Sequence, residues 1–541
     1  MLKRLKEVLE PHHGPKRGSA CKRIPVDLPA ILALLALLVV LSASSCSSAA
    51  PSTDPSVVGQ WSGESPWPTV GVHINILADG RVLTWGRDLP ASAGGVFPTF
   101  VVTIPSGSTN TSQVVRLDLD NEVFCAGETF MPDGRVWVSG GEEALIDGIG
   151  TPVIEIFDPA TTSWSLGPKM SGKRWYPTAT TLPNGEILNL AGSVDESFSA
   201  NTIPDVSTNH GTGMRSLTAV SRVPVDYDYP RAFVAPNGKV FIAGMKPITR
   251  YLDTSGTGAY TTVANTIDGA RTFGTAVMYD IGKVLIAGGA YGNAYTPLKT
   301  AEVIDLGAAT PTWRNVAPMA FARTYPNATI MADGRILISG GNSAAGQEDA
   351  TKPVLAGEIW DPATEKFTTV ASMPHFRTYH STAGLLPDGR VLSTGTTAPS
   401  KPSLLDQLNA DFYSPPYLFK GARPTISSAP TLVRYGQQFT VMTPNAASIS
   451  NVNWIGLSAV THHFNFNQRI NRLSFTNGTG ALTVTAPPNA NLCPPGHYMM
   501  FILNSSGAAS VANVVQILAG PTSTAGATHP SASQWSSFYG P

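Results

Sequence analysis

Short apolar strands, each preceded by a tight polar turn, recur along the middle of the chain. Each unit has a turn with glycine, then a charged residue, then an apolar run that ends in glycine, as in PDGRVWVSGG and ADGRILISGG. The turn glycines are Gly80, Gly134, Gly185, Gly238, Gly282, Gly334 and Gly389. They lie about 50 residues apart, and no helical periodicity competes with the strand pattern. Hairpins repeated at this period predict kelch-type blades, and seven copies predict a seven-bladed β-propeller over residues 57–413.

From Ser414 onward the repeat stops and another strand pattern begins. QQFTVMT, ALTVTAPP and HYMMFILNSS alternate at period two between Pro, Asn and Gly. This pattern predicts a small immunoglobulin-like β-sandwich over residues 414–520. Residues 521–541 are rich in Ser, Thr, Pro and Gly, which predicts a flexible tail. The folded part of the chain is therefore expected to be all-β.

Residues 1–56 have the pattern of an export segment followed by a linker. A basic stretch precedes the apolar run Leu28 to Leu41, which is shorter than the about 20 residues of a membrane span and typical of a signal sequence. A Ser/Pro-rich stretch follows. Cys46 comes after small residues, so acylation of its thiol as in a lipoprotein, simple cleavage and an uncleaved membrane anchor all stay open. We expect an extracytoplasmic protein, either secreted or membrane-anchored.

The composition restricts the partners. With 42% hydrophobic and 13% charged residues, the chain can bury large cores. Its net charge is −1, and outside the basic N-terminal stretch acidic residues exceed basic ones, so we expect no nucleic-acid partner. Apart from Cys21 and Cys46 in the export segment, only Cys125 and Cys493 remain, too few for a disulfide framework. We expect a monomer.

The residue nine positions before each turn glycine marks the same place in every blade. We call these the ring residues: Gly71, Cys125, Tyr176, Tyr229, Phe273, Tyr325 and His380. Inner strands run beside the propeller axis, so the ring residues should line one level of the channel. The aromatic ones are expected to pack, whereas Cys125 and His380 break the pattern. A cysteine in place of an aromatic leaves a hole, which the phenol of Tyr176 in the next blade can fill.

Two histidine-containing runs offer metal ligands, although no local metal motif is present. His380 follows Tyr379, and both can reach one centre only if the strand end bends, since neighbours on a strand point to opposite faces. His462 and His463 fall in a predicted strand, so at most one of them should enter a buried site. From spacing alone, hydrogen-bonded core histidines remain the alternative to metal ligands.

Five segments together resemble the galactose oxidase and glyoxal oxidase family of copper-radical oxidases. They are NEVFCAGETFMPDGRVWVSGG, KRWYPTATTLPNGEI, FRTYHSTAGLLPDGRV, VTHHFNFNQRI and PPGHYMMFILNSSGAASVA. The resemblance extends over about residues 60–518. The run of Arg174, Trp175 and Tyr176 is more similar to the glyoxal oxidases of this family.

The resemblance implies a set of site residues. In the family, a thioether joins the cysteine of a Phe-Cys pair to a tyrosine of the next blade, which corresponds here to Cys125 and Tyr176. The Tyr-His pair before a PDGR turn corresponds to Tyr379 and His380, and the Thr-His before Gln-Arg corresponds to His462. The resemblance implies one copper ion held by Tyr176, Tyr379, His380 and His462. Two imidazoles and two phenols suit copper(II), which favours tetragonal N and O ligands.

The resemblance also implies the chemistry. Copper changes by one electron, whereas the oxidation of an alcohol or aldehyde takes two, and a self-processed radical on the Cys125–Tyr176 thioether would supply the second. Small aldehydes, primary alcohols or saccharides would be oxidised with O2 to give H2O2. Tyr379 would be the axial ligand and take the substrate proton. Arg271 lies near the place of a substrate-binding arginine of the family.

Where galactose oxidase places a tryptophan over the thioether, this chain has Val194 or Asp195, so the stacking residue is not assigned. An alternative function is a non-catalytic kelch propeller that binds glycans or cell-wall material. A glycosidase-type propeller would need paired carboxylates near the axis, and the ring residues include none.

Overall fold

The computed structural model describes residues 52–87, 96–143, 148–221, 226–346, 351–397 and 406–518, and the chain from Thr53 onward forms one compact unit. The predicted export segment with Cys21 and Cys46, and the predicted tail from residue 521, lie outside the described residues. Within the described ranges the helices are α2 (Pro55–Val58) and four 3-10 turns, Asn209–Gly211, Thr218–Val220, Pro416–Phe419 and Ala446–Ser448. None of these helices is long and apolar enough to cross a membrane. The predicted all-β class is confirmed.

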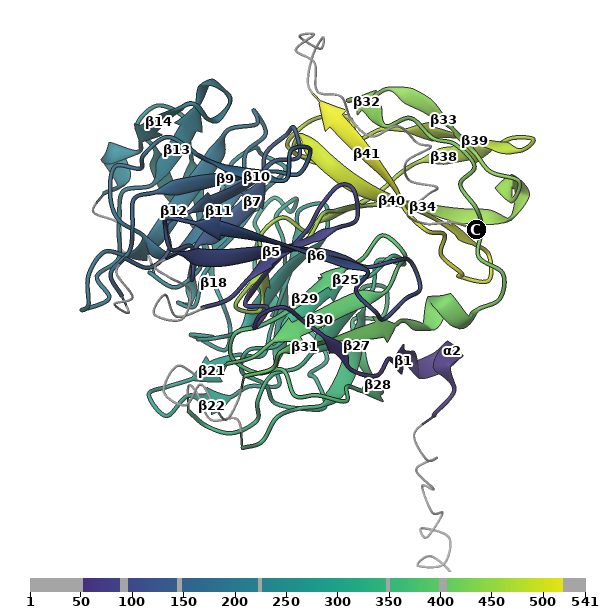
Figure 1. The fold of residues 1–541 in the computed structure, drawn as a ribbon, viewed down its shortest axis with the longest axis horizontal. Helices are drawn as coiled ribbons and strands as arrows, with labels where there is room; N and C mark the ends of the chain where they lie inside the picture. The colour runs from purple at the N-terminus through teal and green to yellow at the C-terminus, as the bar shows by residue number, and fades with distance from the viewer. Residues whose placement is uncertain are drawn as a thin grey trace, which may run out of the picture. The chain divides into compact units, whose positions relative to one another are not determined.

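Six sheets each contain four antiparallel strands that follow one another closely along the chain. Figure 1 shows how the strands are arranged. The first contains β3 (His73–Ile76), β4 (Val82–Trp85), β5 (Phe97–Thr103) and β6 (Gln113–Leu119). The second contains β7 (Gly127–Phe130), β8 (Val136–Ser139), β9 (Ile154–Asp158) and β10 (Ser163–Leu166). The third contains β11 (Trp175–Thr181), β12 (Ile187–Ser193), β13 (Asp205–Thr208) and β14 (Gly213–Ser216). The fourth contains β15 (Arg231–Val234), β16 (Val240–Ala243), β17 (Ile248–Asp253) and β18 (Ala259–Asn265). The fifth contains β19 (Thr275–Asp280), β20 (Lys283–Ala287), β23 (Ala301–Asp305) and β24 (Trp313–Asn315), with the hairpin β21 (Ala290–Tyr291) and β22 (Thr296–Pro297) beside it in sequence. The sixth contains β25 (Asn327–Ile330), β26 (Ile336–Ser339), β27 (Ala356–Asp361) and β28 (Lys366–Ser372).

A seventh sheet joins segments from far apart in the chain. It contains β29 (Ser381–Leu385), β30 (Val391–Gly395), β31 (Asn409–Ser414), β1 (Gln60–Trp61) and β2 (Ser65–Pro66). Both short N-terminal strands pair with β31. The hydroxyl of Tyr413 in β31 also donates to the carbonyl of Val58 at 2.8 Å. The N-terminal segment is thereby fastened to the last of the seven sheets.

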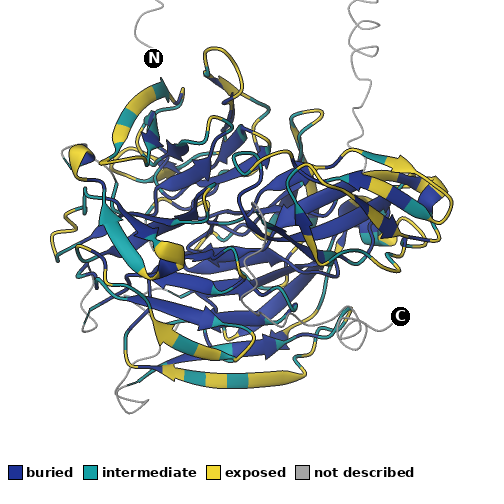
Figure 2. Cartoon of the chain, turned by 90° about the horizontal axis from the view of Figure 1, so that it is seen from above, coloured by how far each residue is buried: buried dark blue, intermediate teal, exposed yellow. Residues whose placement is uncertain are grey.

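Burial changes from the first to the last strand of each sheet. The first strands, such as β7 and β25, are buried along their whole length, whereas the last ones, such as β10 and β18, contain only half-buried and exposed residues. Figure 2 shows this contrast as dark blue inner strands and outer strands with yellow segments. The hairpin turn between the first two strands of each sheet carries the repeated glycine. All seven turn glycines have φ between 69° and 95°, a conformation that glycine adopts without a steric penalty.

The C-terminal segment forms two further sheets. One contains β32 (Leu432–Arg434), β34 (Ile449–Gly456), β37 (Ile470–Arg472), β40 (Gly496–Asn504) and β41 (Asn513–Leu518). The other contains β33 (Gln438–Met442), β38 (Phe475–Asn477) and β39 (Ala481–Thr485). Apolar residues from both sheets share one core, which also holds Cys493. In Figure 1 these strands form the green-to-yellow group.

One hairpin of this C-terminal segment leaves its own sheets. β35 (Ala459–Thr461) and β36 (Phe464–Asn465) pair with each other, and β35 also pairs with β3, the first strand of the first sheet. The residues between the two strands are His462 and His463. His462, a predicted ligand from the C-terminal segment, is thus carried to β3, the first strand of the first sheet.

Candidate metal centre

The five predicted side chains of the centre lie together. Tyr176 OH is 2.9 Å from His462 Nε2 and 2.5 Å from Tyr379 OH. Cys125 Sγ is 3.6 Å from the same imidazole nitrogen. Cys125, His380 and His462 bring ligand atoms within 4.8 Å of one another. All five residues are buried, and Tyr379 is the most exposed at 9%.

The ring residues share one backbone conformation. The six that are not glycine have positive φ: Cys125 59°, Tyr176 63°, Tyr229 40°, Phe273 60°, Tyr325 56° and His380 64°. Bulky residues rarely adopt this left-handed region, and each instance costs about 1–3 kcal/mol. Main-chain hydrogen bonds between neighbouring sheets hold the conformation in place, for example from Tyr176 N to Cys125 O at 2.9 Å and from Tyr229 N to Tyr176 O at 3.0 Å.

The second histidine run differs from its prediction. His462 and His463 were expected in a strand, which is wrong, because they are the two central residues of the β35–β36 hairpin turn, with φ of 47° and 62°. Two positive φ values in a two-residue loop are typical of a type I′ turn. The turn directs the His462 ring to Tyr176, whereas His463 Nε2 accepts from the buried guanidinium of Arg231 at 3.1 Å. Only one of the two histidines faces the cluster.

The bend required at Tyr379 and His380 is present. Both residues precede β29, and the positive φ of His380 turns the chain before the strand begins. Their rings stack with centroids 3.8 Å apart. Neighbouring residues therefore contribute to one centre without facing opposite sides of a strand.

Hydrogen bonds at Nδ1 orient both imidazoles. The hydroxyl of Thr461 donates to the carbonyl of Val72 at 2.9 Å, so it accepts from His462 Nδ1–H at 2.6 Å. The carbonyl of Thr397 accepts from His380 Nδ1–H at 3.2 Å. In both rings the Nε2 lone pair is thus left to face the cluster, as a metal ligand requires.

The protonation states suit a cation. Burial lowers the pKa of His462 well below its usual value and lowers that of His380 to about 3, so both rings are neutral near pH 7. Burial, together with the nearby Cys125 and Tyr379, raises the pKa of Tyr176 well above its usual value. A phenolate at this position therefore needs a bound positive charge. Buried His380 Nε2 has no hydrogen-bond partner, so the donor set of two imidazole nitrogens and two phenol oxygens fits a copper ion.

An aromatic group covers Tyr176 from one side. The rings of Trp175 and Tyr176 have centroids 3.9 Å apart at 66°. Phe198 and Tyr227 pack around the same indole, at 5.6 Å and 6.4 Å. Phe198 is 40% exposed, so this group extends from the buried cluster to the surface.

Arg271, predicted to bind substrate, lies in a buried ion pair. Its guanidinium bonds to Glu302 and Asp268, both at 2.8 Å, and to main-chain carbonyls of its own sheet. Equivalent buried pairs occur in three other sheets: Arg174–Asp205, Arg323–Glu358 and Arg377–Asp411. None of the hydrogen bonds of Arg271 goes to the cluster. Its position is that of a repeated clamp between strands, and its predicted role in substrate binding stays a prediction.

The structure gives a place at the site to three residues to which the sequence patterns assigned no role. Thr461 directly precedes His462 in VTHH, yet its bond to Nδ1 depends on the hairpin turn. Thr397 belongs to the loop after β30, where nothing in the sequence marks it. Trp175 carries a usable signal, because it directly precedes the ring residue Tyr176.

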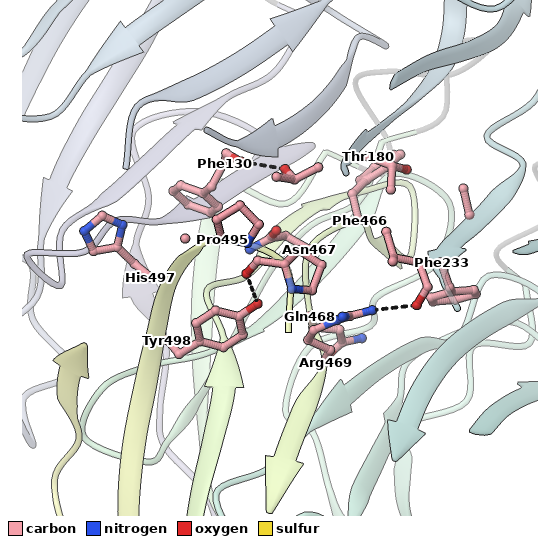
Figure 3. A pocket seen from close by; sticks show the side chains of 15 residues that line it. Phe130, Thr180, Phe233, Phe466, Asn467, Gln468, Arg469, Pro495, His497 and Tyr498 are labelled. Atoms are coloured by element: carbon pink, nitrogen blue, oxygen red, sulfur yellow. Dashed lines mark hydrogen bonds between the residues drawn. The ribbon is translucent and has the colours of Figure 1, made fainter. Parts of the chain in front are cut away.

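A small cavity lies away from the cluster, next to the Gln468–Arg469 segment. It has a volume of about 30 Å³, room for one or two water molecules. Figure 3 shows the lining of this cavity. Phe130 and Thr180 come from the seven sheets, which we call the first group, and His497 and Tyr498 come from the two C-terminal sheets, which we call the second group. The Arg469 guanidinium donates to Val234 O at 3.0 Å beside it. This cavity belongs to the seam between the two groups of sheets.

Residues 106–417 match the family model described as glyoxal oxidase N-terminus. The chain belongs to this glyoxal oxidase family. Residues 423–517 match the model described as galactose oxidase-like, early set domain. The family membership predicted from the five segments is confirmed, and with it the prediction of an oxidase.

Individual proteins that are similar to this glyoxal oxidase family member are also oxidases. Galactose oxidase of Gibberella zeae is 27% identical over 491 residues, which cover 85% of this chain and 71% of that protein. Aldehyde oxidase GLOX of Vitis pseudoreticulata is 28% identical over 458 residues, which cover 76% of this chain and 84% of that protein. The solved structure of a fungal alcohol oxidase in complex with copper superposes with a TM-score of 0.74 at 26% identity, covering 85% of this chain and 99% of that one.

Proposed function

We propose that this protein is a copper-radical oxidase that oxidises small aldehydes or primary alcohols with O2 and releases H2O2. The observation that carries the proposal is the convergence of Cys125, Tyr176, Tyr379, His380 and His462 in one buried cluster. Tyr176, Tyr379, His380 and His462 would hold the copper ion. Cys125 and Tyr176 would form the thioether.

We also propose that the seven sheets are the blades of a propeller over residues 57–413, followed by an immunoglobulin-like sandwich over residues 414–520. The seven equivalent hairpin turns and the shared conformation of the ring residues support the first part. The common core of the two C-terminal sheets supports the second. From the sequence we propose that the protein is extracytoplasmic, either secreted or held at the membrane through its N-terminal segment. We also propose that it is a monomer.

Bound copper and the oxidised, thioether-linked phenol would together accept the two electrons of the substrate and pass them to O2. A side chain of the protein would accept the proton of the substrate. Tyr379 OH lies 2.5 Å from Tyr176 OH at the most exposed point of the cluster, so it is placed to accept the hydroxyl proton of an alcohol or a hydrated aldehyde. The neutral imidazoles of His380 and His462 keep their Nε2 atoms unprotonated throughout.

The aromatic group around Trp175 has two roles in this proposal. Its contact with the ring of Tyr176 keeps water from that face of the phenol. Phe198 and Tyr227 continue it outward as an apolar wall for a small substrate. The names of the relatives, galactose oxidase, aldehyde oxidase and alcohol oxidase, support the same range of substrates. A non-catalytic propeller that only binds glycans would not explain why these five side chains converge in one buried cluster.

Peptide mapping after copper loading in air tests the proposal. We expect a Cys125–Tyr176 peptide that is two hydrogens lighter than its parts and resists reductant, with peroxide released from an aldehyde and alcohol panel. Buried Cys493 serves as an internal reference, because it should alkylate fully once the protein is denatured. Cys125→Ser should bind copper but form no linked peptide and release only background peroxide. A copper-loaded, peroxide-producing protein whose Cys125 still alkylates would overturn the proposal.

A further inference from the structure

A buried histidine–glutamate pair lies directly behind Cys125. His73 begins β3 and Glu128 lies in β7, and both side chains are fully buried. His73 Nδ1 is 2.9 Å from Glu128 Oε2. The indole of Trp85 stacks on the imidazole, with ring centroids 4.5 Å apart and planes at 10°. The hydrogen bond to Glu128 thus fixes the imidazole within its plane, and the indole of Trp85 packs against one of its faces.

The other nitrogen of this imidazole bonds to the main chain of the cysteine. Cys125 N–H donates to His73 Nε2 at 3.1 Å. At other places in the ring, the equivalent N–H donates to the carbonyl of the preceding ring residue, as in Tyr176 N to Cys125 O, Tyr229 N to Tyr176 O and Tyr325 N to Phe273 O. Before Cys125 that residue is Gly71, whose carbonyl instead accepts from the hydroxyl of Thr382 at 2.7 Å. A side chain therefore replaces the main-chain acceptor at the cysteine of the ring.

These bonds determine the tautomer and the role of each group. Because Cys125 N–H occupies the Nε2 lone pair, the ring proton of His73 is on Nδ1 and is donated to Glu128. Cys125 is then held on both sides, by His73 at its N–H and by Tyr176 at its carbonyl. Its φ of 59° is strained for a residue with a β-carbon. The direction of its Cα–Cβ bond, and with it the place of Sγ, depends on that conformation.

We propose that His73, oriented by Glu128, is a positioning residue for the formation of the Cys125–Tyr176 thioether. In that step a C–S bond forms while the S–H bond and one ring C–H bond of Tyr176 break. The two electrons and two protons pass to O2, which becomes H2O2. The inference rests on the proposed function and concerns the maturation of its centre. His73 acts by holding the sulfur where it meets the ring carbon, without touching either reacting atom.

Two substitutions of His73 separate positioning from folding. His73→Phe keeps a flat ring against Trp85 but cannot accept the Cys125 N–H, whereas His73→Gln carries an amide oxygen near the place of Nε2. Each protein is prepared without copper, loaded with copper in air, and followed by intact mass and by the linked peptide. We expect His73→Phe to cross-link about 10²-fold more slowly and His73→Gln to approach the wild-type rate. Glu128→Leu should slow the step as well, and Glu128→Gln should restore it.

A matched control and two further measurements keep the test sharp. Ser207→Ala also removes a buried side-chain acceptor from a main-chain N–H, that of Ile187 at 2.7 Å, and should leave the cross-linking rate unchanged. Copper stoichiometry and the unfolding midpoint before cross-linking should be alike in His73→Phe and Ser207→Ala. Equal rates in wild type and His73→Phe, or a His73→Gln protein as slow as His73→Phe, would overturn the inference alone. A wild-type protein that never cross-links would overturn the proposed function itself.

Discussion

At the scale of single residues, hydrogen bonds at Nδ1 orient the two imidazoles whose Nε2 atoms would hold copper in the proposed centre. Thr461 Oγ1 fixes His462, and the carbonyl of Thr397 fixes His380. The two differ in one respect that matters for experiment. The carbonyl of Thr397 belongs to the backbone, so no side-chain substitution removes it. The hydroxyl of Thr461 can be removed by a substitution that keeps nearly the same side-chain shape.

Thr461→Val is expected to weaken copper binding by about 10–100-fold. The valine keeps the volume of threonine but leaves His462 Nδ1–H without its acceptor, so the ring loses its fixed tautomer and orientation. Thr461→Ser retains the hydroxyl and is the matched control. Competition titration with a copper chelator measures both. Identical affinities for Thr461→Val and Thr461→Ser would show that the hydrogen bond does not orient the ligand.

At the scale of elements, each of four sheets contains a buried arginine paired with an acid on its third strand. Arg323 illustrates the arrangement, with bonds to Glu358 at 2.7 Å and to the carbonyls of Gly340 and Ala356. Both side chains are fully buried. The pair ties the segment before β25 to β26 and β27. It therefore acts within one sheet, and none of the hydrogen bonds of Arg323 goes to the cluster.

Glu358→Ala is expected to lower the free energy of unfolding by about 3–5 kcal/mol, because it leaves a buried guanidinium without its counter-charge. Denaturant unfolding of the copper-free protein measures the loss. Asp118→Ala, which removes a surface partner of Arg116 with both side chains nearly half exposed, should cost less than about 1 kcal/mol. Similar losses in the two variants would contradict a structural role for the buried pair.

The strand repeat could be predicted from sequence because each unit is local, with a glycine turn between two apolar runs. The same alignment identified Cys125, Tyr176 and His380 as neighbours, since equivalent positions in a repeat lie at one level. The hairpin turn of His462 and His463 could not be predicted, because such turns usually carry Asn or Gly. Its pairing with β3 joins residues almost 400 positions apart, and no local pattern encodes that contact. The ion pair of Arg271 could not be predicted for a related reason, since its place in the chain does not indicate which acid it meets.

At the scale of the whole molecule, the proposed copper centre would take its ligands from both groups of sheets. The hairpin with His462 is locked onto the inner strands by Gln468, whose side chain accepts from Ile330 N at 3.0 Å and donates to Ala328 O at 2.6 Å. One apolar core also contains residues of both groups, such as Ile338 and Phe501. Neither group can move far without disturbing the cluster.

This arrangement predicts that the described part of the chain unfolds in a single transition, and that copper raises its midpoint as a whole. Because ligand binding stabilises only the folded state, free copper at about 100 times its Kd should add about 2.7 kcal/mol. Differential scanning calorimetry with and without copper measures the shift. Gln468→Ala leaves two buried main-chain groups without partners and should lower the midpoint in both conditions, at about 1–3 kcal/mol for each group. Two separate transitions in the wild-type protein, with only the earlier or later one moved by copper, would show that the two groups of sheets fold independently and that His462 is not held in place before the metal arrives.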